Sequence, residues 1–464
     1  MNCIMNKKSR NRQKNVNLLE GSIAGTLARL AFPIMCTSFI QMAYNLTDMI
    51  WIGRVSSNAV AAVGAAGMYL WLANGFSTIP RIGGQVRTAH AIGAGEREKA
   101  MSCAQAAFHM GIVMLLVCTL VYVFGSHTLI AFFQLNQESV VLDAETYLVI
   151  TGLGLCFSFL NQIFTGLFTA IGKSMVMFQA TTTGLIVNIA LDPLLIFGAG
   201  PLPRLGVAGA ALATVLAQAV VCLMFVRAAG KDELLFQGFH ICSCSSLKEW
   251  KSIGKIGLPV AVQNILFSSL SMIIARMIAS WGDAAVAVQK VGSQIESISW
   301  MTAEGFATAV NAFTAQNHGA QKKERVRKGY ATAAGLMVCW GLFTSFVLMV
   351  LPEQIFRIFI TDPAVLPLGV DYLRILGVSQ LFMCLEITSA GAFQGLGKPM
   401  LPSVAGILGN AARVPLAAVL SATVLGLNGI WWSITISSIA KGVVVVSAFL
   451  VMLRKYMQSE RKDT

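Results

Sequence analysis

The segment Tyr44-Asn45-Leu46-Thr47-Asp48-Met49-Ile50-Trp51-Ile52-Gly53 places a single acid, Asp48, near the end of an apolar stretch that begins at about residue 30. Hydrocarbon does not solvate an ionised carboxylate. An acid at membrane depth therefore normally faces the protein interior or a watery cavity, where it titrates or binds a cation. The segment predicts a membrane-spanning helix that carries a functional acid.

The whole chain has the composition of a polytopic helical membrane protein. Of its 464 residues, 56% are hydrophobic and only 12% are charged. Apolar runs such as 110–124 and 335–351 are continuous rather than alternating, which favours helices over a β-barrel. Runs near the length that crosses a bilayer predict an all-α fold with twelve transmembrane helices. These spans are expected at 24–52, 57–83, 101–124, 143–170, 175–198, 206–228, 253–280, 284–315, 328–351, 369–394, 400–424 and 427–453.

The basic residues indicate the topology. A net charge of +13 would suggest nucleic acid as a partner of a soluble protein, but here Lys and Arg gather in alternate loops. The positive-inside rule then places both termini in the cytoplasm of a plasma (inner) membrane protein, with no nucleic acid partner. No cleavage site precedes the first apolar run, so we expect no removed signal peptide. The cysteines lack ligand spacing, and no cofactor is expected.

An internal repeat of about 225 residues divides the chain into similar halves. Three pairs of segments match in the same order: 147–152 with 372–377, 166–175 with 391–400, and Gly206-x-x-Gly209 with Gly426-x-x-Gly429. Pro33 and Pro259 are also equivalent. Because six spans per half is an even number, the two six-helix lobes should be related by a pseudo-twofold axis along the membrane normal. The expected domains are an N-terminal lobe with its tail at 1–228, a cytoplasmic connector at 229–250 and a C-terminal lobe at 251–464.

Further polar residues of the first half are expected near Asp48. Asn188 and Asp192 lie four residues apart on one helix face, and Pro193 frees a backbone carbonyl one turn earlier. Asp48 and Asp192 each lie roughly 28 Å along a helix from a basic anchor, so they should sit at similar height, within reach of Thr214. These oxygen ligands predict a site that couples transport to protons or sodium. The alternative is that they are ordinary interhelical hydrogen-bonding residues.

The second half does not duplicate this group, because Ile274 and Val414 stand opposite Asp48 and Asp192 in the repeat. The second half has acids of its own at other positions. Glu304 alternatively pairs with a base, and Arg413 is expected to extend toward a membrane interface. The residues that we assign to a possible substrate cavity are Tyr44, Asn45, Glu386 and Glu304.

Taken in order, four motifs resemble those of the multidrug and toxic compound extrusion (MATE) family, over essentially the whole chain. The motifs are Asn45-Leu-Thr-Asp48 before Ile52-Gly53-Arg54, Ala91-Ile-Gly-Ala-Gly95, Asn188-x-x-x-Asp192-Pro193 and Gly206-Val-Ala-Gly-Ala-Ala-Leu-Ala-Thr214. The resemblance implies a two-lobed antiporter that exports organic, often cationic compounds. The chain is similar to the DinF-type subgroup, whose coupling site lies in the first lobe. The resemblance implies that this site comprises Asp48, Asn188, Asp192 and Thr214 here. The seventh span lacks the acid that other members carry there.

The sequence therefore predicts a monomeric antiporter of small organic molecules, driven by a proton or sodium gradient. The alternative is a lipid-linked saccharide flippase, which would require a cationic cavity to which Arg81, Arg276 and Arg413 would contribute. An enzyme is disfavoured because neither His-Glu-x-x-His nor Gly-x-Ser-x-Gly occurs in the spans. A passive channel would be distinguished by its downhill current.

Overall fold

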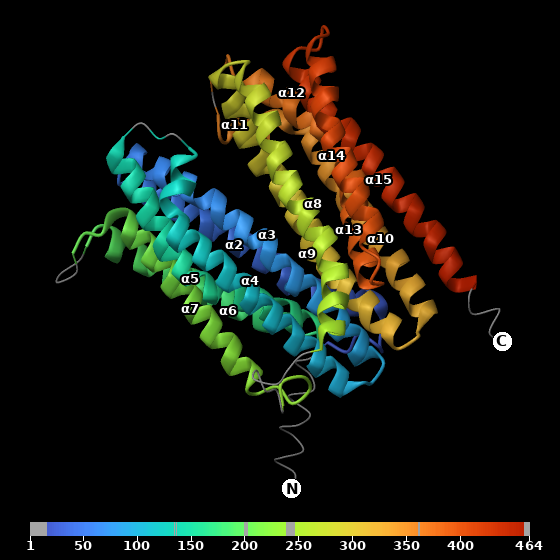
Figure 1. The fold of residues 1–464 in the computed structure, drawn as a ribbon. Coiled ribbons are helices and arrows are strands. Elements are labelled where there is room, and N and C mark those ends of the chain that lie inside the picture. The colour runs from blue at the N-terminus through green and yellow to red at the C-terminus, as the bar shows by residue number, and fades with distance from the viewer. Residues whose placement is uncertain are drawn as a thin grey trace. The chain divides into compact units, whose positions relative to one another are not determined.

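The computed structural model describes residues 16–133, 135, 137–198, 203–237, 246–360 and 362–458, and within these ranges it contains helices and no strands (Figure 1). The helices of the first half are α2 (Ile23–Gly53), α3 (Ser57–Gly93), α4 (Arg97–Ala131), α5 (Glu138–Ala170), α6 (Ser174–Ile196) and α7 (Gly206–Ala229). The helices of the second half are α8 (Leu247–Ala279), α9 (Asp283–Gly319), α10 (Lys323–Val350), α11 (Pro352–Arg357), α12 (Leu366–Gly377), α13 (Gln380–Gly395), α14 (Met400–Ser421) and α15 (Leu427–Gln458). Eleven of the twelve predicted spans each fall on one of these helices, and the tenth falls on α12 and α13.

The predicted tenth span is not one straight helix. Ten of the described helices are long and apolar enough to cross a membrane, and α12 and α13 together form a further span bent by 48°. At the break, the Ser379 hydroxyl and the Gln380 amide both donate to the carbonyl of Leu376, at 3.0 and 3.1 Å. Side chains that compete for a backbone carbonyl in this way bend helices, and hydropathy does not detect them. The remaining predicted span corresponds to α9, which is 37 residues long and richer in polar residues.

The described residues form two compact units. The first unit contains residues 16–17 and 32–261, and the second contains 18–31 and 262–458. Both α2 and α8 are therefore divided between units, each within three residues of its repeat-related proline, Pro33 or Pro259. The boundaries expected from the sequence, at 228 and 251, stay a prediction.

Each unit has the same internal packing order. In the first unit, α3 packs against α4 and α5, α5 packs against α4 and α7, and α6 packs against α7. In the second unit, α9 packs against α10 and α13, α13 packs against α10 and α15, and α14 packs against α15. The helices in these two series stand in the order that the sequence repeat requires, so the repeated sequence corresponds to a repeated helical bundle.

The glycine motif of the repeat has the same structural role in both units. Gly206 and Gly426 have φ values of 53° and 51°, a left-handed conformation that favours glycine. A Cβ atom on Gly209 would lie 2.3 Å from the carbonyl oxygen of Leu195, and one on Gly429 would lie 2.4 Å from that of Leu420. The second glycine of each motif therefore permits close contact with the end of the preceding helix.

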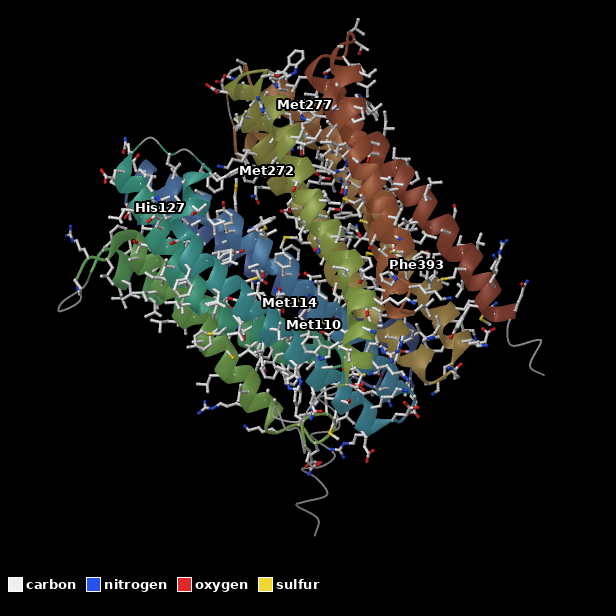
Figure 2. The ribbon with its side chains drawn as sticks, viewed as in Figure 1. Met110, Met114, His127, Met272, Met277 and Phe393 are labelled. Atoms are coloured by element: carbon white, nitrogen blue, oxygen red, sulfur yellow. The ribbon has the colours of Figure 1, made fainter. Side chains whose placement is uncertain are left out.

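An apolar core stabilises each unit. Tyr147 and Phe159 of α5 belong to the first core, whereas Tyr372 and Trp431 belong to the second and stack edge to face. Two methionines labelled in Figure 2 pack against these cores: Met114 of α4 against the first and Met277 of α8 against the second. Flexible thioethers suit the irregular spaces of a core.

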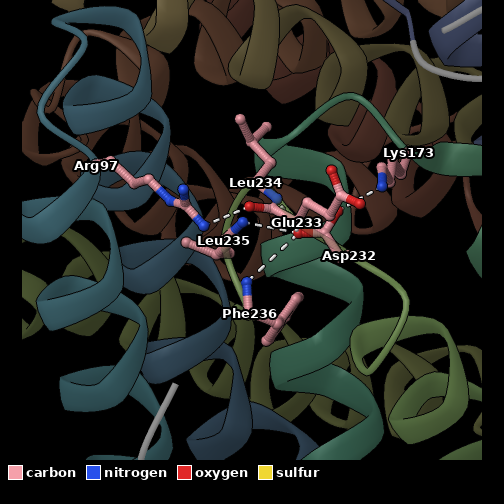
Figure 3. Close-up of polar contacts among 7 residues, drawn as sticks. All are labelled: Arg97, Lys173, Asp232, Glu233, Leu234, Leu235 and Phe236. Atoms are coloured by element: carbon pink, nitrogen blue, oxygen red, sulfur yellow. Dashed lines mark hydrogen bonds and ion pairs between the residues drawn. The ribbon is translucent and has the colours of Figure 1, made fainter. Parts of the chain in front are cut away.

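The start of the connector is held against the first unit (Figure 3). Asp232, which is 3% exposed, forms an ion pair with Lys173, and its Oδ1 atom accepts hydrogen bonds from the backbone N–H groups of Leu234, Leu235 and Phe236. A buried carboxylate needs such partners to offset its lost hydration. Arg97 at the start of α4 donates to the carbonyl of Glu233. Connector residues 238–245 and the basic N-terminal residues 1–15 lie outside the described residues.

Candidate ion-coupling site

The fifth predicted span, α6, positions an amide and an acid on one buried face. The Nδ2 atom of Asn188 donates a hydrogen bond to Oδ1 of Asp192 at 3.1 Å, and both side chains are 0% exposed. Pro193 follows within the helix, and its ring nitrogen cannot donate to the carbonyl of Ile189. The helical spacing thus brings the two polar side chains together as the sequence predicted.

Asp48 of α2 joins this pair within the first unit. The hydroxyl of Thr214, on α7, donates to Oδ2 of Asp48 at 3.4 Å. The carboxyl group of Asp48 also neighbours the carboxyl group of Asp192 and the amide group of Asn188. The four residues that the sequence assigned to a coupling site, from α2, α6 and α7, are therefore neighbours.

Two tyrosines border the carboxylates. Tyr44 lies one turn before Asp48 on α2, and Tyr147 reaches the same place from α5. Both phenol groups lie beside Thr214 and within the electrostatic field of the two acids. Tyr44 was predicted as a cavity residue, whereas sequence reasoning missed Tyr147. The only signal for Tyr147 was its match to Tyr372 in the repeat, which indicates packing as readily as function.

Within the described part of the chain, the acids of this group form no ion pair with a base. Among the described residues, none of the ion pairs includes Asp48 or Asp192. Three buried oxygen atoms also lack a hydrogen-bond donor: Oδ1 of Asp48, Oδ1 of Asn188 and Oδ2 of Asp192. Carboxylate, amide and hydroxyl oxygens are hard ligands that suit a small cation, and two adjacent carboxylates can instead share a proton. The group therefore fits either coupling ion.

The other candidate residues lie apart from this group. Asn45 is exposed on α2, and Glu304 is exposed on α9 of the second unit. Glu386 of α13 is 8% exposed and forms an ion pair with Lys441 of α15, with 3.3 Å between Oε1 and Nζ. Sequence reasoning did not identify Lys441 as its partner, because no spacing rule links residues on helices so far apart in the chain.

Among its described residues, the second unit has no equivalent of the acidic group. Ile274, opposite Asp48 in the repeat, is 5% exposed in the second core, and Val414, opposite Asp192, packs against that core. Asn410, opposite Asn188, accepts a hydrogen bond from Lys441 at 3.1 Å. The predicted asymmetry between the halves is thus present in the side-chain packing.

Comparison with known proteins agrees with the internal repeat. The pattern of the family described as MatE matches residues 33–194 and again 259–419, so the two matches begin at Pro33 and Pro259. The chain belongs to the MATE family. It is therefore a membrane-embedded secondary transporter and not an enzyme. Its similarity to the DinF-type subgroup stays a prediction.

Curated relatives and solved structures of this family cover nearly the whole chain. A protein of Thermotoga maritima named "Probable multidrug resistance protein NorM" is 28% identical over 91% of each chain. A Shewanella oneidensis protein named "FAD transporter" is 22% identical over 92% of this chain and 94% of its own. A crystal structure described as MATE in the bent conformation matches with a TM-score of 0.89, 23% identity and coverage of 96% of this chain and 98% of that one. The twelve-helix, two-lobed fold of MATE transporters is thus shared by this chain.

Proposed function

We propose that this MATE transporter exports small organic molecules across the plasma membrane, in exchange for protons or sodium ions that move inward. The T. maritima relative named as a multidrug resistance protein, similar along 91% of both chains, supports drug export over the alternative of a saccharide flippase. Cationic compounds are the first substrate class to test, because the acids near Tyr44 favour positive charge. The protein works as a monomer with both termini in the cytoplasm.

The observation that carries this proposal is the pair of uncompensated acids in the first unit. Asp48 and Asp192 share one site, yet no described base forms an ion pair with either. Two neighbouring carboxylates away from water are costly while both are charged. Binding a proton or a sodium ion removes part of this cost. The ion thereby shifts the equilibrium between conformations that differ in their affinity for it.

Asn188 and Thr214 complete the coupling site in this proposal. Asn188 holds the carboxylate of Asp192 through its amide nitrogen and leaves its own oxygen available. Thr214 holds Asp48 from a third helix. An ion bound between the acids would therefore contact α2, α6 and α7 at once. Such a contact is a physical route from ion binding to helix rearrangement, which alternating access requires.

The test is gradient-driven export of ethidium, an organic cation, from proteoliposomes under either an imposed proton gradient or an imposed sodium gradient. Wild-type protein should respond to one of the two. Asp48→Asn and Asp192→Asn should each abolish that response. Both variants should still elute from a size-exclusion column at the position of the folded wild type. Asp283→Asn, which changes an exposed acid at the start of α9, is the matched control and should retain export. Export by both site variants at the wild-type rate would refute the coupling role.

A further inference from the structure

Trp51 of α2 lies between Asp48 and the exposed end of that helix. It follows Asp48 by three residues, about 4.5 Å along the axis, so the two side chains share one face of α2. Long side chains in a helix lean toward its N-terminus, which directs the indole back toward the turn that carries Asp48. The Trp51 side chain therefore borders the proposed coupling site.

Contacts on two sides hold the indole in place. Its ring meets that of Phe197 edge to face, with 6.1 Å between the ring centroids. Phe197 directly follows α6, the helix that carries Asp192. Just beyond the end of α2, the guanidinium carbon of Arg54 lies 4.9 Å from the centroid of the Trp51 ring. The indole also packs against the apolar core of the first unit, so it is held beside the same two helices as the acids.

The indole N–H of Trp51 is a buried donor without an acceptor. Among the described residues, no hydrogen bond reaches Nε1 of Trp51, Oδ1 of Asp48 or Oδ2 of Asp192. A buried tryptophan N–H normally has a partner, because an unpaired donor costs free energy. The two carboxyl groups are neighbours. One donor and two acceptors are thus unpaired in one region of the first unit.

These three atoms match the hydrogen-bonding groups of one water molecule. The donor and the acceptors are too far apart to bond each other directly, since each of them is unpaired. A buried water binds roughly two to four polar partners. A water between these atoms would accept from the indole N–H and donate one hydrogen to each carboxylate. Such bridging waters bind nearly as well as direct hydrogen bonds.

We infer that the indole N–H of Trp51 orients a bound water molecule whose hydrogens point to Oδ1 of Asp48 and Oδ2 of Asp192. The inference rests on the proposed function and adds Trp51 to it as a positioning residue. Held in this way, the water presents its hydrogens to the acids and not its lone pairs. A proton or sodium ion that binds between the acids must displace or turn this water. The N–H group therefore weakens ion binding and favours ion release, which an antiporter needs in every cycle.

The buried charged group of the second unit differs, because its charges balance one another. Glu386 and Glu296 both act on the guanidinium of Arg413, and Glu386 also forms an ion pair with Lys441 at 3.3 Å. The guanidinium donates to two serine hydroxyls of α15, at 3.2 and 3.0 Å, so the expectation that Arg413 extends toward a membrane interface is wrong. Charge balance in this group requires no bound ion, in contrast to the acids of the first unit.

Trp51→Phe tests the role of the N–H group, since it keeps an aromatic ring and removes the donor. The measurement is the rate of ethidium export from proteoliposomes over a range of concentrations of the effective ion. The ion concentration that gives half the maximal rate should fall by about threefold to tenfold, as expected for the loss of one hydrogen bond. A merely structural role of the indole would lower the maximal rate or the thermal midpoint and leave this concentration unchanged.

Two further variants control for the change of ring. Trp281→Phe makes the same substitution at an exposed position just beyond α8, the repeat counterpart of α2, and should leave the half-maximal ion concentration unchanged. Trp51→His restores a ring N–H and should return that concentration part of the way toward the wild-type value.

Nuclear magnetic resonance of the purified full-length protein tests the water itself without any gradient. With isotope-labelled tryptophan, the indole N–H signal of Trp51 is the one that Trp51→Phe removes, or that Trp51→His removes if the first variant does not fold. In wild type this signal should show a cross-peak with the protons of a long-lived water. Its position should change in Asp48→Asn, whereas the signal of Trp281 should not move.

Three results would overturn the inference: a half-maximal ion concentration that Trp51→Phe leaves unchanged, an equal change in Trp281→Phe, or an indole signal of Trp51 without a water cross-peak. Failure of the proposed export function is seen separately. Wild-type vesicles would then move no ethidium under either gradient, and the magnetic resonance result would still decide whether Trp51 holds the water.

Discussion

Asn188 donates a hydrogen bond to Asp192 at 3.1 Å, across one turn of α6. Its repeat counterpart in the second unit, Asn410, instead accepts one from Lys441, also at 3.1 Å. The same amide position thus supports an acid in one unit and a base in the other. The two bundles pack similarly, but the side chain bound to this amide is acidic in the first unit and basic in the second. We therefore place the proposed ion coupling in the first unit.

Replacing Asn188 by Ala should weaken both folding and coupling. Oδ1 of Asp192 would lose the hydrogen bond from the amide of Asn188, and a buried acceptor left without a partner costs about 1–3 kcal/mol. We expect a lower thermal midpoint in detergent and slower ethidium export under the effective gradient. Asn264→Ala, at an exposed position of α8, is the control. Equal behaviour of the two variants would show that the amide of Asn188 has no special role.

The Glu386–Lys441 pair should behave as a coupled unit. Each group is about nine-tenths buried, so removal of one partner leaves the other charge buried without its ion-pair partner, at a cost of about 3–5 kcal/mol. Glu386→Leu and Lys441→Met should therefore each lower the thermal midpoint strongly. The double variant should recover most of the loss, because it removes both charges. Additive losses in the double variant would mean that the two side chains do not stabilise each other.

Arg325 should anchor the segment that precedes α2. Its guanidinium donates to three backbone carbonyls, those of Leu18 at 3.2 Å, Glu20 at 2.8 Å and Gly21 at 2.9 Å. Both the segment and Arg325 belong to the second unit. Arg325→Ala should release the carbonyls of Glu20 and Gly21, whereas that of Leu18 keeps its hydrogen bond from Asn317. A glutamate-specific protease should therefore cleave after Glu20 sooner than in wild type, as measured by mass spectrometry.

The control for this experiment is Arg327→Ala. Arg327 forms an ion pair with Glu324 at 2.9 Å, but both side chains are more than half exposed. Such surface pairs contribute about 0–1 kcal/mol. Cleavage after Glu20 should therefore keep its wild-type rate in this variant. If the protease also cleaves the Arg325→Ala variant at the wild-type rate, the contacts with the backbone carbonyls do not restrain the segment.

The sequence predicted the acidic site because its signals are local. Acids are rare in apolar helices, and a spacing of four places Asn188 and Asp192 on one face. Tyr147 carries no such signal, since an aromatic residue in an apolar run looks like ordinary core. Lys441 was also missed, because its pairing with Glu386 depends on how α13 and α15 pack.

The helix break at Ser379 was hidden from the sequence for a related reason. Hydropathy averages over a window, so residues 369–394 read as one span. The break depends on two side chains that bind a single carbonyl, that of Leu376. Only the folded backbone brings these three groups within hydrogen-bonding distance. Helix existence and the repeat could thus be predicted, whereas interhelical partners and local bends could not.

The paired glycines provide a test of the repeat itself. A methyl group on Gly209 or Gly429 would lie 2.3 or 2.4 Å from a backbone carbonyl oxygen of the preceding helix, too close for either helix to remain in place. Overpacking of this kind costs about 1–3 kcal/mol. Gly209→Ala and Gly429→Ala should therefore each lower the thermal midpoint, and by similar amounts, because the two positions are structurally equivalent.

Gly64→Ala is the matched control, since a Cβ atom at Gly64 of α3 would meet nothing within 4 Å. Alanine is the better helix former by about 0.5–1 kcal/mol, so this variant should be as stable as wild type or slightly more so. A loss at Gly209 without a loss at Gly429 would mean that the two halves share a sequence pattern but not a packing requirement. Similar losses at both, against an unchanged control, would establish that the two units depend on the same close approach of helices.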